Sequence, residues 1–284
     1  MFSPTPITLC LFCMGMLALS AADSAMAGSG DRGEKALKIS VVYNNIAHDP
    51  GPQLQTAWGF ACLIQGLDQT ILFDTGGDAA ILLANLRRLG LDTIRIDAIV
   101  LSHEHADHTG GLGAVLSRQP EVIVYLPASF PDRFHQLVRR HGARAEIVSG
   151  SRQLLPSVYS TGEMGSSTQE QGLILDLPGG LILITGCAHP NVAAMVERAV
   201  DYLDKPVQLV MGGFHLAGSS EAEIRRIITG LQALGVTKVA PSHCTGEDAI
   251  RLFRAAWGED FISGGLGAVI ELPLSVAPGV NAPP

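Results

Sequence analysis

The sequence has 284 residues, of which 47% are hydrophobic and 16% are charged, and its formal net charge at neutral pH is −8. This length is enough for one large α/β domain with a sizeable core, and no linker of distinct composition divides it. The negative charge disfavours nucleic acid, and no basic groove is visible. We therefore expect a small-molecule substrate and no nucleic-acid partner, and the sequence leaves the oligomeric state open.

The first residues are typical of a targeting segment. Ile7–Leu19 is mostly apolar but too short to span a bilayer, and Ala25 to Ala27 has the small-x-small pattern of a signal peptidase site. No Lys or Arg precedes the apolar run, since the first positive side chain is Arg32. We predict a signal peptide over residues 1–27, a mature chain that begins at Gly28 without a membrane span, and a periplasmic or secreted protein. A retained membrane anchor is the alternative.

The next part of the chain alternates apolar runs with Pro and Gly residues, which is typical of strands and turns. It predicts three strands, at Leu37–Ile46, Phe60–Gln65 and Thr70–Asp74. A helix is expected over Asp78–Gly90, because apolar residues recur at helical spacing between an Asp suited to the N-cap and a Gly suited to the C-cap.

The most chemically distinctive stretch is Ile99–Leu112, where an apolar strand ends in histidines and acids. Its polar side chains are His103, Glu104, His105, Asp107 and His108. Imidazole nitrogens and carboxylate oxygens in this density suit zinc, manganese or iron, and their crowding beside a buried strand is costly unless something pairs with them. The stretch therefore predicts a metal site at the carboxyl end of a strand, the usual edge for α/β active sites.

The remaining elements predict two mixed sheets back to back, with helices outside. We expect a short helix from Thr109, a strand at Glu121–Leu126, a helix at Asp132–His141, a strand at Ala145–Val148, and a hairpin of Leu173–Asp176 with Leu181–Thr185. Three strand-and-helix units should follow. We place the domain at residues 36–275 and a flexible tail at residues 276–284.

Three later histidines also follow apolar strands: His189, His215 and His243. With the first cluster, six of the nine histidines lie at strand ends, which a random scatter would rarely produce. A single histidine at such a place is more often structural, but the repetition favours a shared site.

The motif His103-x-His105-x-Asp107-His108 resembles the signature of the metallo-β-lactamase superfamily. Similar family motifs are Leu72–Gly76, Thr185–Pro190, Gly212–Leu216 and Pro241–Gly246, and the likeness covers about Leu37–Leu272. The last three motifs resemble the branch that includes the ribofuranosylaminobenzene phosphate synthase. The resemblance implies a four-layer αββα sandwich that holds two divalent metal ions.

Carried over residue by residue, the resemblance implies that His103, His105 and His189 hold one metal, and that Asp107, His108 and His243 hold the other. Many family members have a bridging Asp at the place where this chain has Cys187. Either His189 occupies the bridging region, or Cys187 supplies a thiolate, or the second site is weaker, and His215 could complete it. In each case we expect His189, His215 and His243 to converge with the first cluster.

Other residues are expected to support these ligands. Asp74 either hydrogen-bonds a ligand imidazole or caps the turn of Thr75 to Gly77. Cys187 and Cys244 are expected as thiols beside the ligands, and a disulfide between them is the competing outcome. The three cysteines outside the leader, which also include Cys62, cannot form a disulfide scaffold.

These expectations predict a binuclear metallohydrolase. Two divalent ions, with zinc expected and manganese or iron as alternatives, would lower the pKa of a shared water to give a hydroxide, and Asp107 would accept a proton. The bond attacked would be an ester, phosphoester, lactone or amide. The alternatives are a metal-containing binding or sensor protein on the same fold, and a synthase or transferase related to the branch named above.

Overall fold

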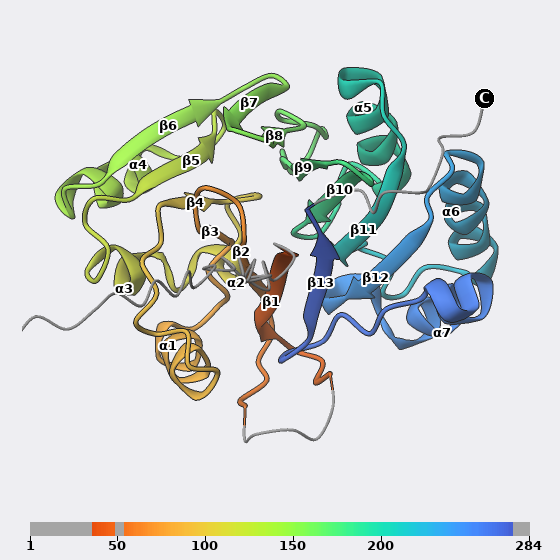
Figure 1. The fold of residues 1–284 in the computed structure, drawn as a ribbon, viewed down its shortest axis with the longest axis horizontal. Helices are drawn as coiled ribbons and strands as arrows, with labels where there is room; N and C mark the ends of the chain where they lie inside the picture. The colour runs from red at the N-terminus through yellow and green to blue at the C-terminus, as the bar shows by residue number, and fades with distance from the viewer. Residues whose placement is uncertain (1–35, 49–53, 275–284) are drawn as a thin grey trace, which may run out of the picture. The chain divides into compact units, whose positions relative to one another are not determined.

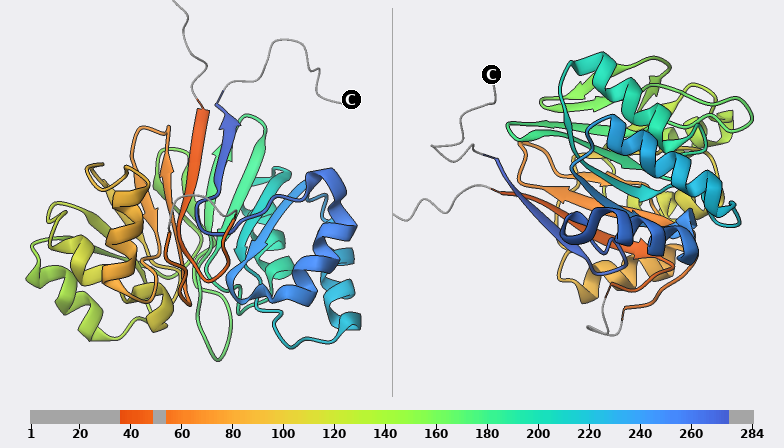
Figure 2. Two further views of the ribbon diagram at one scale, coloured as in Figure 1. Left: turned by 90° about the horizontal axis from the view of Figure 1, so that it is seen from below. Right: turned by 90° about the vertical axis from the view of Figure 1, so that its right-hand side faces the viewer.

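The computed structural model describes residues 36–48 and 54–274, which form two sheets face to face with helices on their outer sides (Figures 1 and 2). The predicted signal peptide and C-terminal tail lie outside the described residues. The expected αββα class is confirmed. None of the described helices has the length and apolar character needed to cross a membrane.

The first sheet has seven strands. Their spatial order is β13 (Val269–Pro273), β1 (Ala36–Asn44), β2 (Phe60–Gln65), β3 (Ile71–Phe73), β4 (Ala98–Val100), β5 (Ile123–Pro127) and β6 (Arg144–Val148). The strands from β13 to β3 pair antiparallel, whereas those from β3 to β6 pair parallel. The parallel half brings the carboxyl ends of β3 and β4 to one edge, where the first histidine cluster begins.

The second sheet has six strands. Their order is β12 (Lys238–Ser242), β11 (Val207–Gly213), β10 (Gly180–Thr185), β9 (Leu173–Leu177), β8 (Val158–Ser160) and β7 (Arg152–Leu155). The pairs β10–β11 and β11–β12 are parallel, so the carboxyl ends of these three strands share an edge as well. The later histidines and both site cysteines follow these ends.

Two features of the second half differ from the prediction. Strands β7 and β8 were not expected, because they are short and Pro156 lies between them. Within the residues that the structure describes, two strand-and-helix units rather than three follow the β9–β10 hairpin and its helix, because β13 returns to pair with β1 of the first sheet.

Helices cover the outer face of each sheet. On the first sheet these are α1 (Ala79–Arg88), α2 (Ala106–Thr109), α3 (Leu112–Leu116) and α4 (Asp132–Arg140); on the second they are α5 (Val192–Leu203), α6 (Glu221–Ala233) and α7 (Glu247–Trp257). Two short 3-10 turns complete the set, η1 (His243–Thr245) and η2 (Gly258–Asp260). The Asp78 side chain accepts hydrogen bonds from the backbone N–H groups of Ala80 and Ile81, which confirms it as the N-cap of α1.

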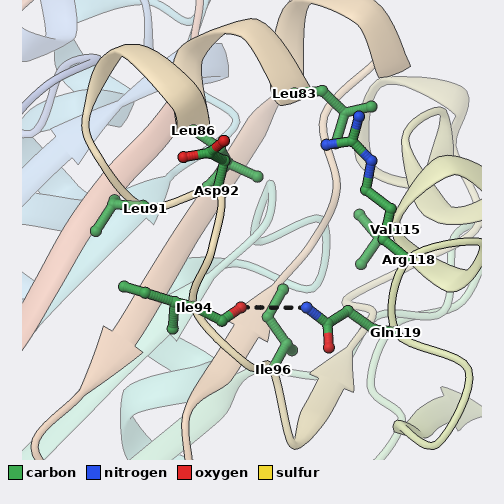
Figure 3. Close-up of a pocket in the computed structure, with 9 residues that line it drawn as sticks. All are labelled: Leu83, Leu86, Leu91, Asp92, Ile94, Ile96, Val115, Arg118 and Gln119. Carbon is green, nitrogen blue, oxygen red and sulfur yellow. Dashed lines mark hydrogen bonds between the residues drawn. The ribbon is translucent and has the colours of Figure 1, made fainter.

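Apolar side chains fill three layers. The central layer lies between the sheets and includes Ile39, Phe60, Cys62 and Met211, while two outer layers lie between each sheet and its helices. In the outer layer of the first sheet, α1 and α3 meet across a small apolar pocket, where Gln119 Nε2 donates a hydrogen bond to the Ile94 carbonyl (Figure 3). This pocket contains none of the predicted site residues.

Candidate metal centre

The structure brings the predicted site residues together at the edge where the parallel strands of both sheets end. The first cluster follows β4, His189 and Cys187 follow β10, and His243 and Cys244 follow β12. Glu104 is not part of the site, because its side chain is exposed and pairs with Arg133 at 3.2 Å.

Three imidazoles form one group of donors: His103, His105 and His189. One ring nitrogen from each lies within 4.8 Å of the others. His103 Nε2 is 3.1 Å from His105 Nδ1, and the rings of His103 and His189 have centroids 4.6 Å apart. Their nitrogens therefore face a common point that one ion can occupy.

A second group contains Asp107, His108, Cys187 and His243. His243 Nε2 lies 3.3 Å from Asp107 Oδ2, and Cys187 Sγ lies 3.3 Å from His108 Nε2. The two groups adjoin, since the His103 and His108 ring centroids are 4.2 Å apart. Among the three alternatives for the missing bridging Asp, this placement favours a thiolate from Cys187, because His189 belongs to the first group.

The donor atoms fit divalent metal ions. His243 Nε2 is buried and, although it lies 3.3 Å from Asp107 Oδ2, it makes no hydrogen bond within the described residues, a costly state for a polar atom unless an ion or ligand satisfies it. Burial lowers the pKa of His103 to about 3 and that of His108 to about 4. Both imidazoles are therefore neutral at pH 7, which is the form that binds metal.

The Asp74 side chain links two residues that follow β4, Ser102 and His108. It accepts hydrogen bonds from the backbone N–H and the hydroxyl of Ser102, both at 2.7 Å, and lies 2.7 Å from His108 Nδ1. Burial raises the pKa of Asp74 to about 8, against the effect of His103 and of the hydrogen bonds from Ser102. Of its two expected roles the structure favours that of partner to an imidazole, an arrangement that orients a ligand ring.

Glu170 is a functional residue that the sequence analysis missed. Its Oε1 accepts the backbone N–H groups of Gly186, Cys187 and Ala188 at 2.8–3.1 Å, and its Oε2 accepts the N–H of His189 and contacts His189 Nδ1 at 2.8 Å. Burial raises its pKa, but the hydrogen bonds from His189 and the nearby His103 outweigh that effect and hold the pKa of Glu170 well below its usual range. One buried carboxylate thus fixes the whole loop after β10.

His243 has its own supports, which the sequence analysis also missed. Asn45 Oδ1 lies 2.7 Å from His243 Nδ1, so the other ring nitrogen is directed at Asp107. The indole of Trp58 lies over the His243 ring with centroids 4.9 Å apart, although 58% of Trp58 is exposed. The sequence signal for these residues is weak, because both lie in loops with no repeating pattern.

His215 belongs to neither of the two groups. Its ring lies 4.4 Å from that of His189, but its donor atom groups with the sulfurs of Cys187 and Cys244. Six of the seven expected ligands thus fall in the two groups, together with Cys187, and the assignment of His215 to the pair of ions stays a prediction. All three described cysteines are free, so the competing disulfide does not form.

We predict that the metal-free protein loses stability as the pH falls from about 6.5 to about 4. The pKa values of His103 and His108 lie below the ordinary 6.5, so the unfolded chain takes up two protons in this range that the folded chain does not. Asp74 acts in the opposite direction. Because its pKa is raised in the folded chain, the folded chain holds one proton there that the unfolded chain lacks in this pH range. The Cys244 thiol adds to the loss above pH 5, because its pKa is lowered to about 5. The net effect is a loss of at least about 3 kcal/mol, at ~1.4 kcal/mol per proton and pH unit.

Urea unfolding of chelator-treated protein at several pH values measures this effect. His103→Gln removes one of the two titrating imidazoles and should flatten the dependence. A free energy of unfolding that stays constant, or rises, from pH 6.5 to pH 4 would contradict the prediction.

Comparisons with known proteins agree with this geometry. The sequence profile of the Metallo-beta-lactamase superfamily matches residues 59–201. The chain is 28% identical over 251 residues to the 7,8-dihydropterin-6-methyl-4-(beta-D-ribofuranosyl)-aminobenzene-5'-phosphate synthase of Methanocaldococcus jannaschii, covering 72% of this chain and 85% of that protein.

Two solved structures share the fold. One is described as a metal-dependent hydrolase of the beta-lactamase superfamily. It is 25% identical in sequence, with a TM-score of 0.68, and the match covers 84% of this chain and 99% of the hydrolase chain. The other is the metallo-beta-lactamase fold protein YhfI from Bacillus subtilis, with a TM-score of 0.61 at 13% identity. The match covers 84% of this chain and 100% of the YhfI chain. With the signature residues assembled at one edge of the sheets, the chain belongs to the Metallo-beta-lactamase superfamily.

Proposed function

We propose that this protein is a binuclear metal-dependent hydrolase that cleaves an ester, phosphoester, lactone or amide bond in a small molecule. The observation that carries the proposal is the pair of adjoining donor groups, one of three imidazoles and one of Asp107, His108, Cys187 and His243. Membership of the superfamily and the structural likeness to a metal-dependent hydrolase support it.

The first group would hold one divalent ion and the second group the other, and zinc suits their mixture of imidazole, carboxylate and thiolate donors. Bound ions of this kind lower the pKa of water and polarise the bond under attack. Side-chain oxygens contact the Nδ1 atoms of three donor imidazoles and keep the rings in place. Asp74 contacts His108, Glu170 contacts His189, and Asn45 contacts His243.

Asp107 is the residue assigned to proton transfer. Burial raises its pKa, but His243 and His108 outweigh that effect and hold the pKa well below the usual range, so the carboxylate is ionised at neutral pH. Its side chain is 20% exposed, unlike the fully buried Asp74 and Glu170. Asp107 can therefore accept a hydrogen bond from the attacking water, and its uptake of the proton would rely on bound metal ions making that water acidic.

A cavity beside the site provides room for the rest of the substrate. Its volume is about 170 Å³, and its lining includes His189, His215, Asn191, Phe214 and Glu223. That volume equals roughly five or six water molecules, so it fits one small substituent of the substrate.

A synthase reaction is the second candidate. The observation that favours it is the 28% identity to the Methanocaldococcus jannaschii synthase, which extends over 85% of that protein. Under this alternative the same metal ions would serve bond formation with the loss of a leaving group. The two candidates share the metal centre and differ in the reaction that it supports.

We predict that removal of metal abolishes hydrolysis and that Zn²⁺, Mn²⁺ or Fe²⁺ restores it. The measurement is turnover of a panel of chromogenic phosphodiester, lactone and β-lactam substrates by native, chelator-treated and reconstituted full-length protein. Turnover that survives complete metal removal would contradict the proposal. If the loaded protein hydrolyses nothing in the panel but forms the compound that the relative's name specifies, the synthase alternative replaces the hydrolase.

A further inference from the structure

We propose that Cys187, His215 and Cys244 form a third metal site, suited to Zn²⁺, which adjoins the paired site and shares Cys187 with it. This inference goes beyond the proposed function, because Cys244 and His215 belong to neither donor group of the pair.

The three donors come from three neighbouring strand ends. Cys187 follows β10, His215 follows β11 and Cys244 follows β12, and these strands lie side by side in that order. The two sulfurs and one imidazole nitrogen all lie within 4.8 Å of one another. Both cysteines are buried, at 4% and 5% exposure, whereas His215 faces solvent and can close the group from outside.

Gly213, at the end of β11, lies against both the loop after β10 and the side chain of Cys244. Strand β11 separates β10 from β12, so side chains from the outer strands reach each other only across its end. A Cβ on Gly213 would lie 2.4 Å from the Gly186 carbonyl oxygen and 2.6 Å from Cys244 Sγ, distances that real Cβ atoms essentially never show. The glycine therefore permits both the close approach of the loop after β10 and the observed position of Cys244 Sγ.

Backbone contacts hold the three loops in register. Gly213 donates its N–H to the Gly186 carbonyl at 3.1 Å, and Ala217 donates to the Cys244 carbonyl at 3.1 Å. His215 has a φ of 50°, a left-handed conformation that is strained for a residue other than glycine. Such strain persists where surrounding contacts enforce it, and here it places the imidazole beside the two sulfurs.

The chemistry of the donors selects the ion. Two thiolates and one imidazole are the donor set of three-ligand zinc sites with an open fourth position, and soft sulfur ligands disfavour Mg²⁺ and Mn²⁺. His215 and His189 both line the cavity described above, so the open position would face bound substrate.

The test is metal titration of the full-length protein after chelation, with Zn²⁺ measured by elemental analysis and Co²⁺ by its sulfur-to-cobalt charge-transfer absorption. We expect three tightly bound ions per chain in the wild type. Cys244→Ser should bind two and lose part of the charge-transfer band, and the part that remains should come from Cys187. His215→Ala should weaken the third ion at least tenfold, and because its side chain is exposed this change leaves the core intact.

The matched control is Cys62→Ser, since Cys62 lies in the central core and should leave all three ions and the band unchanged. Wild-type stoichiometry and an unchanged band in both Cys244→Ser and His215→Ala would overturn the third site. Combined His103→Ala and His105→Ala distinguishes this failure from failure of the proposed function. If the third site is real, that variant loses the ion of the first group and keeps the Cys244-dependent part of the band.

Discussion

Combined replacement of His103 and His105 by Ala is expected to abolish hydrolysis, with at least a thousandfold loss of kcat/KM. The change removes two of the three imidazoles in the first donor group. Charge stabilisation by a bound ion contributes several kcal/mol to the transition state, and each ~1.4 kcal/mol corresponds to a factor of about ten in rate. Steady-state kinetics on any substrate that the wild type hydrolyses measures the loss.

The fold should survive this change. His105 is exposed, and His103 is buried beside a core built from three layers of apolar side chains that do not depend on it. We expect a destabilisation of about 1–3 kcal/mol, visible in thermal unfolding but not in the secondary structure reported by circular dichroism. His135→Ala on α4 is the matched control and should retain full turnover. If the double variant turns over substrate at the wild-type rate, the chemistry lies elsewhere in the molecule.

The donor residues could be predicted because they end apolar strands. His103, His189 and His243 each follow a buried run, and the carboxyl ends of parallel strands meet at one edge of a sheet. The division of donors between ions could not be predicted in the same way. It depends on the side-chain directions of Cys187 and His215, which are set by backbone conformations that no residue pattern encodes.

The supporting residues were harder to foresee for a related reason. Glu170 lies in a polar segment between β8 and β9, and its partners are backbone N–H groups, which carry no sequence signal. Asn45 lies in the loop after β1 and acts through His243, 198 residues away. Contacts of this kind arise only when distant loops fold together, so single-sequence patterns predict the ligands better than the groups that orient them.

Strained backbone is concentrated at the same edge. Seven described residues other than glycine have a positive φ, and five of them lie in or next to the site: Asp74, Ala188, Asn191, His215 and His243. Each such conformation costs on the order of 1–3 kcal/mol and persists only where its surroundings enforce it. For the loop after β10, which contains Ala188 and Asn191, the enforcing group is the Glu170 carboxylate.

Replacing Glu170 by Ala is accordingly expected to give the largest loss of stability of any single substitution at the site. It leaves the N–H groups of Gly186, Cys187, Ala188 and His189 without their acceptor. A buried donor without a partner costs about 1–3 kcal/mol, so we expect a loss of about 4 kcal/mol or more. In a domain of this size that corresponds to a fall in Tm on the order of 10 °C. Thermal and urea unfolding of chelator-treated protein measures it, so that bound metal does not mask the effect.

Glu170→Gln separates the structural role of Glu170 from its role toward the metal. The amide oxygen can still accept the three N–H groups that Oε1 accepts, but its NH₂ group faces the N–H of His189, so His189 loses its orienting partner. We expect a smaller loss of stability than for Glu170→Ala. The first group should bind its ion 10–100-fold more weakly, the effect typical of removing a group that orients a ligand.

Glu104→Ala is the matched control, because Glu104 is an exposed acid next to His103 and its removal should change stability by less than about 0.5 kcal/mol. If Glu170→Ala unfolds at the wild-type temperature and binds metal as tightly, the carboxylate does not hold the loop, and the strain at Ala188 and Asn191 must be enforced by the β10–α5 packing alone.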